Sequence, residues 1–260
     1  MKPMKNTFLL AIVGAAIATA SVAHAGVVNI QFDGYSYWNA GTYTGNQGAY
    51  TGDNVASPTW NSFTCTSSST ASGSMSNLVA SDGTATTEAV SFTSTGSWND
   101  VNSYGSNPFN ILLNAYLYST APSTAPSSVT LTGLTAGGSY DLYLYGQNGQ
   151  GYNNGAAFSI STGTGSPITG SNSFTTGAIT TGASAPTFQE NANYVIFNAT
   201  ANASGTLGVN WITTPGKSEG DFNGLQVIST AAAVPEPASV GLMGAGALGL
   251  LLLGRKRKTA

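Results

Sequence analysis

Tyr140-Asp-Leu-Tyr-Leu-Tyr145 is the stretch of sequence that decides the fold class. In an extended chain successive side chains point to opposite faces, so Tyr140, Leu142 and Leu144 share one face. That face is apolar and predicts the core side of a strand at residues 139–147. The preceding segment, Leu131-Thr-Gly-Leu-Thr-Ala-Gly-Gly138, ends in a glycine-rich turn. The turn predicts an antiparallel pairing with a strand at 128–132.

Similar short segments, rich in β-branched and aromatic residues, recur between clusters of Gly, Asn, Ser and Pro. This pattern predicts an all-β sandwich without a substantial helix. The other expected strands are 27–33, 88–93, 110–118, 156–161, 194–199, 205–212 and 224–229. Residues 34–75 are expected to form an irregular loop set, with flexible patches near 66–76 and 120–128.

The expected first and last strands bracket this region. Val27-Val-Asn-Ile-Gln-Phe-Asp33 and Gly224-Leu-Gln-Val-Ile228, with the neighbouring Gly220-Asp-Phe-Asn-Gly224, resemble the opening and closing strands of galactose-binding-like jelly rolls. The resemblance implies a single jelly-roll-like β-sandwich ectodomain over residues 26–230. It also implies that the first and last strands lie close together.

The charges are concentrated at the two ends of the 260-residue chain. The middle contains one basic residue, Lys217, and nine acidic ones, so a nucleic-acid partner is disfavoured. All twelve Tyr and all four Trp also lie in the middle. Such aromatic content favours a folded domain over a disordered linker.

Residues 1–25 have the three parts of a secretory signal peptide. Lys2 and Lys5 precede an apolar stretch at residues 8–18, and Ala23-His24-Ala25 supplies the small residues of a cleavage site. Signal peptidase is the expected processing enzyme, and Gly26 is the expected mature N-terminus. The chain is therefore expected to be exported through the inner membrane.

Residues 231–260 have the character of a membrane anchor. The uncharged run at 238–254 is at the short end of what crosses a hydrocarbon core of about 30 Å. A basic tail follows, made of Arg255, Lys256, Arg257 and Lys258. Under the positive-inside rule the tail stays in the cytoplasm and the acidic domain lies outside.

Pro235, Glu236 and Pro237 precede this predicted transmembrane helix, and their prolines favour an exposed, non-helical spacer. The order of triplet, short helix and basic end over 234–258 resembles the PEP-CTERM sorting signal. In that family an exosortase, a membrane cysteine protease-transpeptidase, recognises the signal in Gram-negative bacteria that make exopolysaccharide. The resemblance implies sorting to the cell envelope surface or the extracellular space. A plain tail anchor is the alternative.

The residue types argue against an enzyme. The only histidine, His24, leaves with the signal peptide, so no catalytic unit that needs imidazole can form. Cys65 is the only cysteine and is expected to be a small buried residue, with no disulfide partner. Acid pairs such as Glu219 and Asp221 leave a glycoside hydrolase as a lesser alternative. No catalytic residue is assigned.

Two binding sites are conceivable from the sequence. Asp33, Glu219 and Asp221 are candidate calcium ligands, because this cation takes several hard oxygen ligands; the alternative is solvated loop acids. The second candidate is a glycan site in an aromatic cluster, because flat rings suit sugar faces. The cluster consists of Tyr35, Tyr37, Trp38 and Tyr43, and Tyr50 and Trp60 follow it in the sequence. The alternative is that these rings cover the core.

Three functions follow as hypotheses. The leading one is a non-catalytic sandwich domain of the cell surface or extracellular matrix. The second is a carbohydrate-binding module with extracellular polysaccharide as its partner, and the third is a polysaccharide-acting hydrolase.

Overall fold

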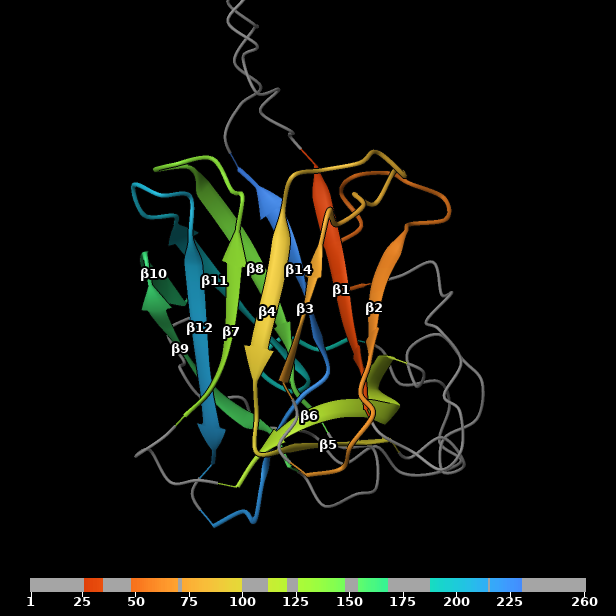
Figure 1. Ribbon diagram of the computed structural model, residues 1–260, viewed down its shortest axis with the longest axis vertical. Helices are drawn as coiled ribbons and strands as arrows, with labels where there is room; N and C mark the ends of the chain where they lie inside the picture. The colour runs from red at the N-terminus through yellow and green to blue at the C-terminus, as the bar shows by residue number, and fades with distance from the viewer. Residues whose placement is uncertain are drawn as a thin grey trace, which may run out of the picture. The chain divides into compact units, whose positions relative to one another are not determined.

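The computed structural model describes eight ranges of the chain: 26–34, 48–69, 72–99, 112–120, 126–147, 154–167, 188–214 and 216–230. All of them lie in one compact unit, His24–Ala233. They form fourteen strands arranged in three sheets (Figure 1). The prediction of an all-β sandwich is confirmed, and the arrangement is compatible with a jelly-roll-like ectodomain.

The six-stranded sheet contains both the first and the last strand of the domain. Its order is β10 (Thr164–Pro167), β11 (Tyr194–Thr200), β8 (Ser139–Tyr145), β14 (Gly224–Ser229), β1 (Val27–Asp33) and β2 (Trp60–Thr64). Neighbours are antiparallel except β1 and β2, which are parallel. Val27 lies opposite Ile228, so the expected closeness of the first and last strands is confirmed.

The five-stranded sheet packs against the six-stranded sheet. Its order is β3 (Ser72–Ser76), β4 (Ala89–Thr93), β7 (Ser127–Thr132), β12 (Leu207–Thr213) and β9 (Ala156–Thr162). The expected pairing of strands 128–132 and 139–147 is wrong, because β7 lies in this sheet and β8 in the other. The segment between them instead crosses the sandwich. Leu134, 7% exposed, is buried in the core there, and its N donates to Gly205 O at 3.1 Å.

A three-stranded sheet covers one end of the sandwich. It consists of β13 (Gly220–Phe222), β6 (Ala115–Ser119) and β5 (Gly96–Asn99), and Figure 1 shows β5 and β6 crossing below the long strands. Phe222 joins this sheet to the core, because its ring lies 5.3 Å from that of Phe32 and 5.0 Å from that of Trp211. This end of the sandwich is therefore closed by aromatic packing.

The core lies between the two large sheets and is built from alternate residues of their strands. Tyr140, Leu142 and Leu144 all face it, as their alternation predicts. The other sheet supplies residues such as Phe92 and Val129, and the rings of Phe32 and Phe92 meet at 5.1 Å. Burial of this apolar area is the main stabilising term of the fold.

The described residues of the expected loop set at 34–75 are more regular than expected. They include β2 and most of β3, and β3 falls within the patch at 66–76 that the sequence predicts to be flexible. β3 is an edge strand with the sequence Ser-Gly-Ser-Met-Ser, which has a single large apolar side chain. The sequence pattern of a strand comes from apolar side chains that are buried on one face. β3 has almost none of these, so its sequence does not predict a strand.

The predicted signal peptide at 1–25 and the predicted transmembrane helix at 238–254 lie outside the described residues. Among the ranges that are described, no helix has both the length and the apolar character needed to cross a membrane.

Candidate functional site

The outer face of the six-stranded sheet carries a buried polar network. The residues of β1 that alternate with its core residues, Asn29, Gln31 and Asp33, are all buried, as is Gln226 of β14. Buried polar groups need hydrogen-bond partners. The segment at residues 48–59 supplies several of them by lying over this face.

Gln226 fixes that segment with its side-chain amide. Tyr50 N donates to Gln226 Oε1 at 3.0 Å, and Gln226 Nε2 donates to Tyr50 O at 3.2 Å and to Asn29 Oδ1 at 2.9 Å. Tyr145 donates its hydroxyl to Gln226 Oε1 and accepts a hydrogen bond from Ala49 N at 2.7 Å. These bonds hold the backbone of residues 49–50 against the outer face of the sheet.

Tyr145 departs from the pattern expected of its strand. It points away from the core yet is 0% exposed, because a second apolar cluster covers it. That cluster joins Tyr145 to Trp60, Leu112 and Leu113. Trp60, which the sequence associates with glycan binding, is therefore buried here.

Three tyrosines form an aromatic row beside this cluster. The rings of Tyr143 and Tyr194 are stacked, with centroids 5.8 Å apart and 23° between their planes. Tyr50 meets Tyr143 edge-on at 5.7 Å. All three side chains are half-buried, and burial is the main cause that raises the pKa of the Tyr143 and Tyr194 phenols. The row keeps part of its aromatic surface in contact with solvent.

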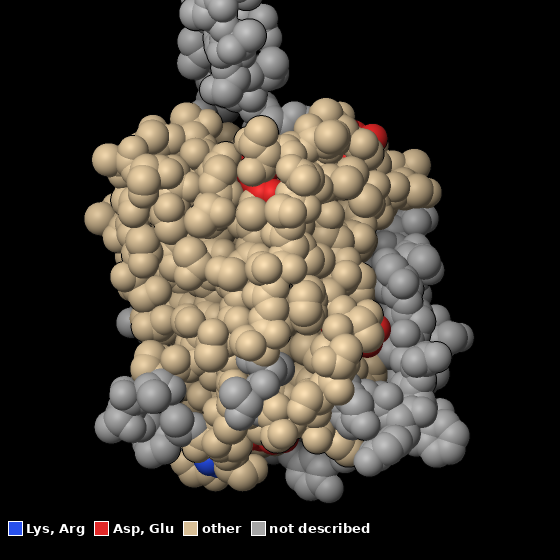
Figure 2. All heavy atoms as spheres, in the orientation of Figure 1, with Lys and Arg blue, Asp and Glu red and all other residues tan. Residues whose placement is uncertain are grey.

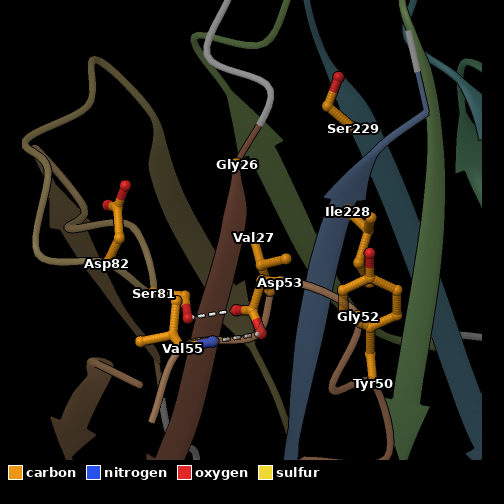
Figure 3. Close-up of a pocket in the computed structure, with 10 residues that line it drawn as sticks. All are labelled: Gly26, Val27, Tyr50, Gly52, Asp53, Val55, Ser81, Asp82, Ile228 and Ser229. Carbon is orange, nitrogen blue, oxygen red and sulfur yellow. Dashed lines mark hydrogen bonds between the residues drawn. The ribbon is translucent and has the colours of Figure 1, made fainter. Parts of the chain in front are cut away.

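A pocket of about 280 Å³ lies where β1 begins and β14 ends (Figure 3). Its polar lining includes Tyr50, Asp53, Ser81, Asp82 and Ser229. Apolar side chains from the ends of both strands complete it. Among the described residues, no Lys or Arg lines it, so the two carboxylates give the pocket a negative potential.

Both carboxylates of the pocket accept hydrogen bonds from their surroundings. Ser81, 2% exposed, donates its hydroxyl to Asp53 Oδ2, and Val55 N donates to Asp53 Oδ1 at 3.4 Å (Figure 3). Thr84 N donates to Asp82 Oδ1 at 2.9 Å. These bonds hold the two acids in defined turns at the pocket rim.

The three predicted calcium ligands lie in different surroundings. Asp33 accepts hydrogen bonds from Asn99 Nδ2 at 3.0 Å and from Thr64 Oγ1 at 3.3 Å. Asp221 is 0% exposed in β13, and Glu219 accepts a hydrogen bond from Asn154 Nδ2 at 2.9 Å. The described residues contain no group of three His, Cys, Asp or Glu side chains that could hold a metal ion. Calcium binding by these three acids stays a prediction without geometric support.

Two carboxyls have pKa values raised by burial. Desolvation raises the pKa of Asp33 to about 6 and that of Glu88 to about 7. A pair of acids that cleaves a glycoside must face one substrate across a few ångströms. Asp33 ends β1, whereas Glu88 precedes β4 in the other large sheet, and Figure 1 shows both strands running downward. The two carboxyls therefore lie at opposite ends of different sheets.

The remaining predicted residues lie outside the described ranges. They are Tyr35, Tyr37, Trp38 and Tyr43 of the aromatic cluster, Ala23 and Ala25 of the cleavage site, and the whole of 231–260. Conversely, the sequence does not predict Asp53, Asp82 or Gln226 as site residues. A signal for Gln226 did exist, since amides stand between apolar residues at positions 29 and 31 of the first strand and at 226 of the last.

Comparison with known proteins supports the reading of the C-terminal segment. Residues 233–258 match the family model of the PEP-CTERM protein-sorting motif. No curated protein and no solved structure matches the chain. The motif implies export, a C-terminus that is transiently anchored in the membrane, and processing by exosortase. The chain is thus an exported protein that carries a PEP-CTERM sorting motif.

Proposed function

We propose that residues 26–230 form a non-catalytic sandwich domain that exosortase sorting delivers to the cell surface or extracellular matrix. The observation that carries this proposal is the chemistry of one face of the fold. The outer side of the five-stranded sheet is rich in hydroxyl groups, with Ser74 opposite Ser91 and Ser91 opposite Thr130. Figure 2 shows a face of the molecule on which uncharged residues predominate.

A largely uncharged, hydroxyl-rich face suits contact with a neutral hydrated polymer. Serine and threonine hydroxyls both donate and accept hydrogen bonds, as sugar hydroxyls do. Figure 2 shows few charged side chains on this face, and none of those within its centre is basic, so the face has little with which to attract a polyanion. It therefore supports a role within extracellular polysaccharide better than a role at a charged surface.

The test uses the full chain, with an epitope in the domain, in a host that has an exosortase. We expect the protein in the surface or matrix fraction, and Ser74→Lys should reduce its retention because a charge interrupts the hydroxyl face. Ala203→Lys, in an exposed turn outside this face, is the control. A periplasmic location, or equal retention of both variants, would contradict the proposal. Release of reducing sugar ends from purified polysaccharide would contradict the non-catalytic part.

A second candidate function is carbohydrate binding, which the aromatic row formed by Tyr50, Tyr143 and Tyr194 favours. Half-buried rings present a flat apolar surface, and sugars offer C–H patches of matching shape. Tyr143 and Tyr194 stand on adjacent strands, which fixes the spacing of their rings.

A glycan array probed with residues 26–234 tests this second function. A binding glycan should lose about tenfold in affinity with Tyr143→Ala, since the stacked surface is then reduced. Trp98→Ala is the matched control, because Trp98 is a 37% exposed ring on the three-stranded sheet. Equal losses in the two variants would argue against the row.

A further inference from the structure

Gly26 lies at the rim of the pocket, and hydrogen bonds fix its surroundings from two sides. Ser229 N donates to Gly26 O at 3.4 Å, and Ser81 N donates to Val27 O at 2.7 Å. Ser81 also donates its hydroxyl to Asp53. A single serine thus connects the Asp53 carboxylate to the residue that follows Gly26.

The charges at this end of the domain are unbalanced. Asp53 and Asp82 both line the pocket, and the described part of its lining includes no basic side chain. Within the described ranges the only basic residue is Lys217, between β12 and β13. Figure 1 shows β12 ending at the lower end of the sandwich, whereas β1 begins at the upper end. Lys217 therefore does not neutralise the pocket.

Signal cleavage would create a cation at this position. Hydrolysis of the Ala25–Gly26 amide adds the hydroxyl of water to the Ala25 carbonyl carbon and a hydrogen to the Gly26 nitrogen. The resulting amine takes up a proton at neutral pH, because an α-amino group ordinarily has a pKa of about 7.7 to 8.0. In the precursor the same nitrogen belongs to an uncharged amide.

We propose that the pocket at the start of β1 receives the α-ammonium group of mature Gly26, which pairs with Asp53 and is attracted by Asp82. Removal of the signal peptide then stabilises the domain, whereas the uncleaved precursor lacks this interaction. The pocket thereby links cleavage of the signal peptide to the folding stability of the domain. The proposal is independent of the surface and carbohydrate functions above.

The attraction is partly solvent-exposed, because Gly26 and Asp53 are both half-buried. Exposed ion pairs contribute modestly, so the expected rise in melting midpoint is about 2 °C. Pairing should raise the pKa of the Gly26 amine above its ordinary value. The extra stability is then full below about pH 7.7 and is lost as the pH rises through the folded-state pKa.

The test compares residues 26–234 with a free Gly26 amine, the same fragment with an acetylated N-terminus, and a third that begins at Ala25. The unit has its own core and keeps all strands of the sandwich. We expect the free Gly26 form to melt highest near pH 6.5 at low salt, with the difference lost near pH 10. Titration of the amine by NMR gives its pKa directly.

Asp53→Asn keeps an oxygen acceptor for Val55 but removes the charge, so it should abolish the gain and lower the amine pKa. Asp141→Asn changes an acid of β8 that accepts a hydrogen bond from Asn198 of β11, and it should leave both the gain and the amine pKa unchanged. Equal midpoints in the three fragments would overturn the proposal. A gain that survives both Asp53→Asn and Asp82→Asn, or an exported protein with another N-terminus, would overturn it as well.

Discussion

The side-chain amide of Gln226 pairs with the backbone of Tyr50 as a neighbouring strand would, donating to its carbonyl and accepting from its N–H. Gln226 is 2% exposed and also bonds Asn29 and Tyr145. One side chain of the last strand therefore fixes the segment that contributes both to the aromatic row and to the pocket.

Replacing Gln226 by methionine should lower the free energy of unfolding by about 3 kcal/mol. Methionine keeps the volume but leaves several buried polar groups without partners, and each such group costs about 1–3 kcal/mol. Urea unfolding of residues 26–234 measures the change. Gln189→Met is the control, since Gln189 is exposed. A loss no larger than that of the control would mean that water replaces the amide.

Cys65 should resist thiol reagents in the folded protein. It is 6% exposed, and burial raises the pKa of its thiol to about 11, so the reactive thiolate is scarce at pH 8. Ellman's reagent should react slowly with the native fragment and rapidly after unfolding in urea. Rapid reaction of the native form would show that the segment around β2 opens locally.

The two carboxyls with raised pKa values should make stability fall with rising pH. Burial raises the pKa of Asp33 from 3.8 to about 6 and that of Glu88 from 4.5 to about 7, so the folded state holds these protons more tightly than the unfolded chain. Their contribution is full below about pH 4 and is lost as the pH rises through about 6 and 7.

Melting midpoints from about pH 4 to 8 test this sign. The wild type should lose more stability across that window than the double variant Asp33→Asn, Glu88→Gln, because neither replacement ionises. Asp141→Asn serves as the control on the outer face of β8. Parallel curves for the wild type and the double variant would contradict the burial argument.

Replacement of both prolines of the triplet, Pro235→Ala with Pro237→Ala, should leave the C-terminal segment attached in a host with an exosortase. The triplet lies within the matched motif, and alanines would remove the restriction by which prolines favour an extended backbone. Mass spectrometry of the surface-associated protein detects the outcome, because the processed wild type should lack peptides that contain Arg255–Lys258.

Deletion of residues 255–258 is an independent check on the same segment. Without cytoplasmic positive charge, the predicted transmembrane helix at 238–254 should be held less firmly in its orientation. If this variant and the double alanine variant are both processed and located like the wild type, the triplet and the basic tail are not what the sorting enzyme requires.

The sequence by itself predicted most strands of the core and identified the sorting motif. Alternation in Tyr140-Asp-Leu-Tyr-Leu-Tyr145 reports local geometry, and the triplet, apolar run and basic tail are linear signals that need no folded context. Only the tertiary structure decided that β7 and β8 lie in opposite sheets, because that depends on burial of Leu134 in a shared core. It also decided that Tyr145 is buried, that Tyr50 meets Gln226, and that Tyr50 and Asp53 line the same pocket. Residues 50 and 226 come together only when the last strand inserts between β8 and β1, a long-range contact that local sequence cannot report.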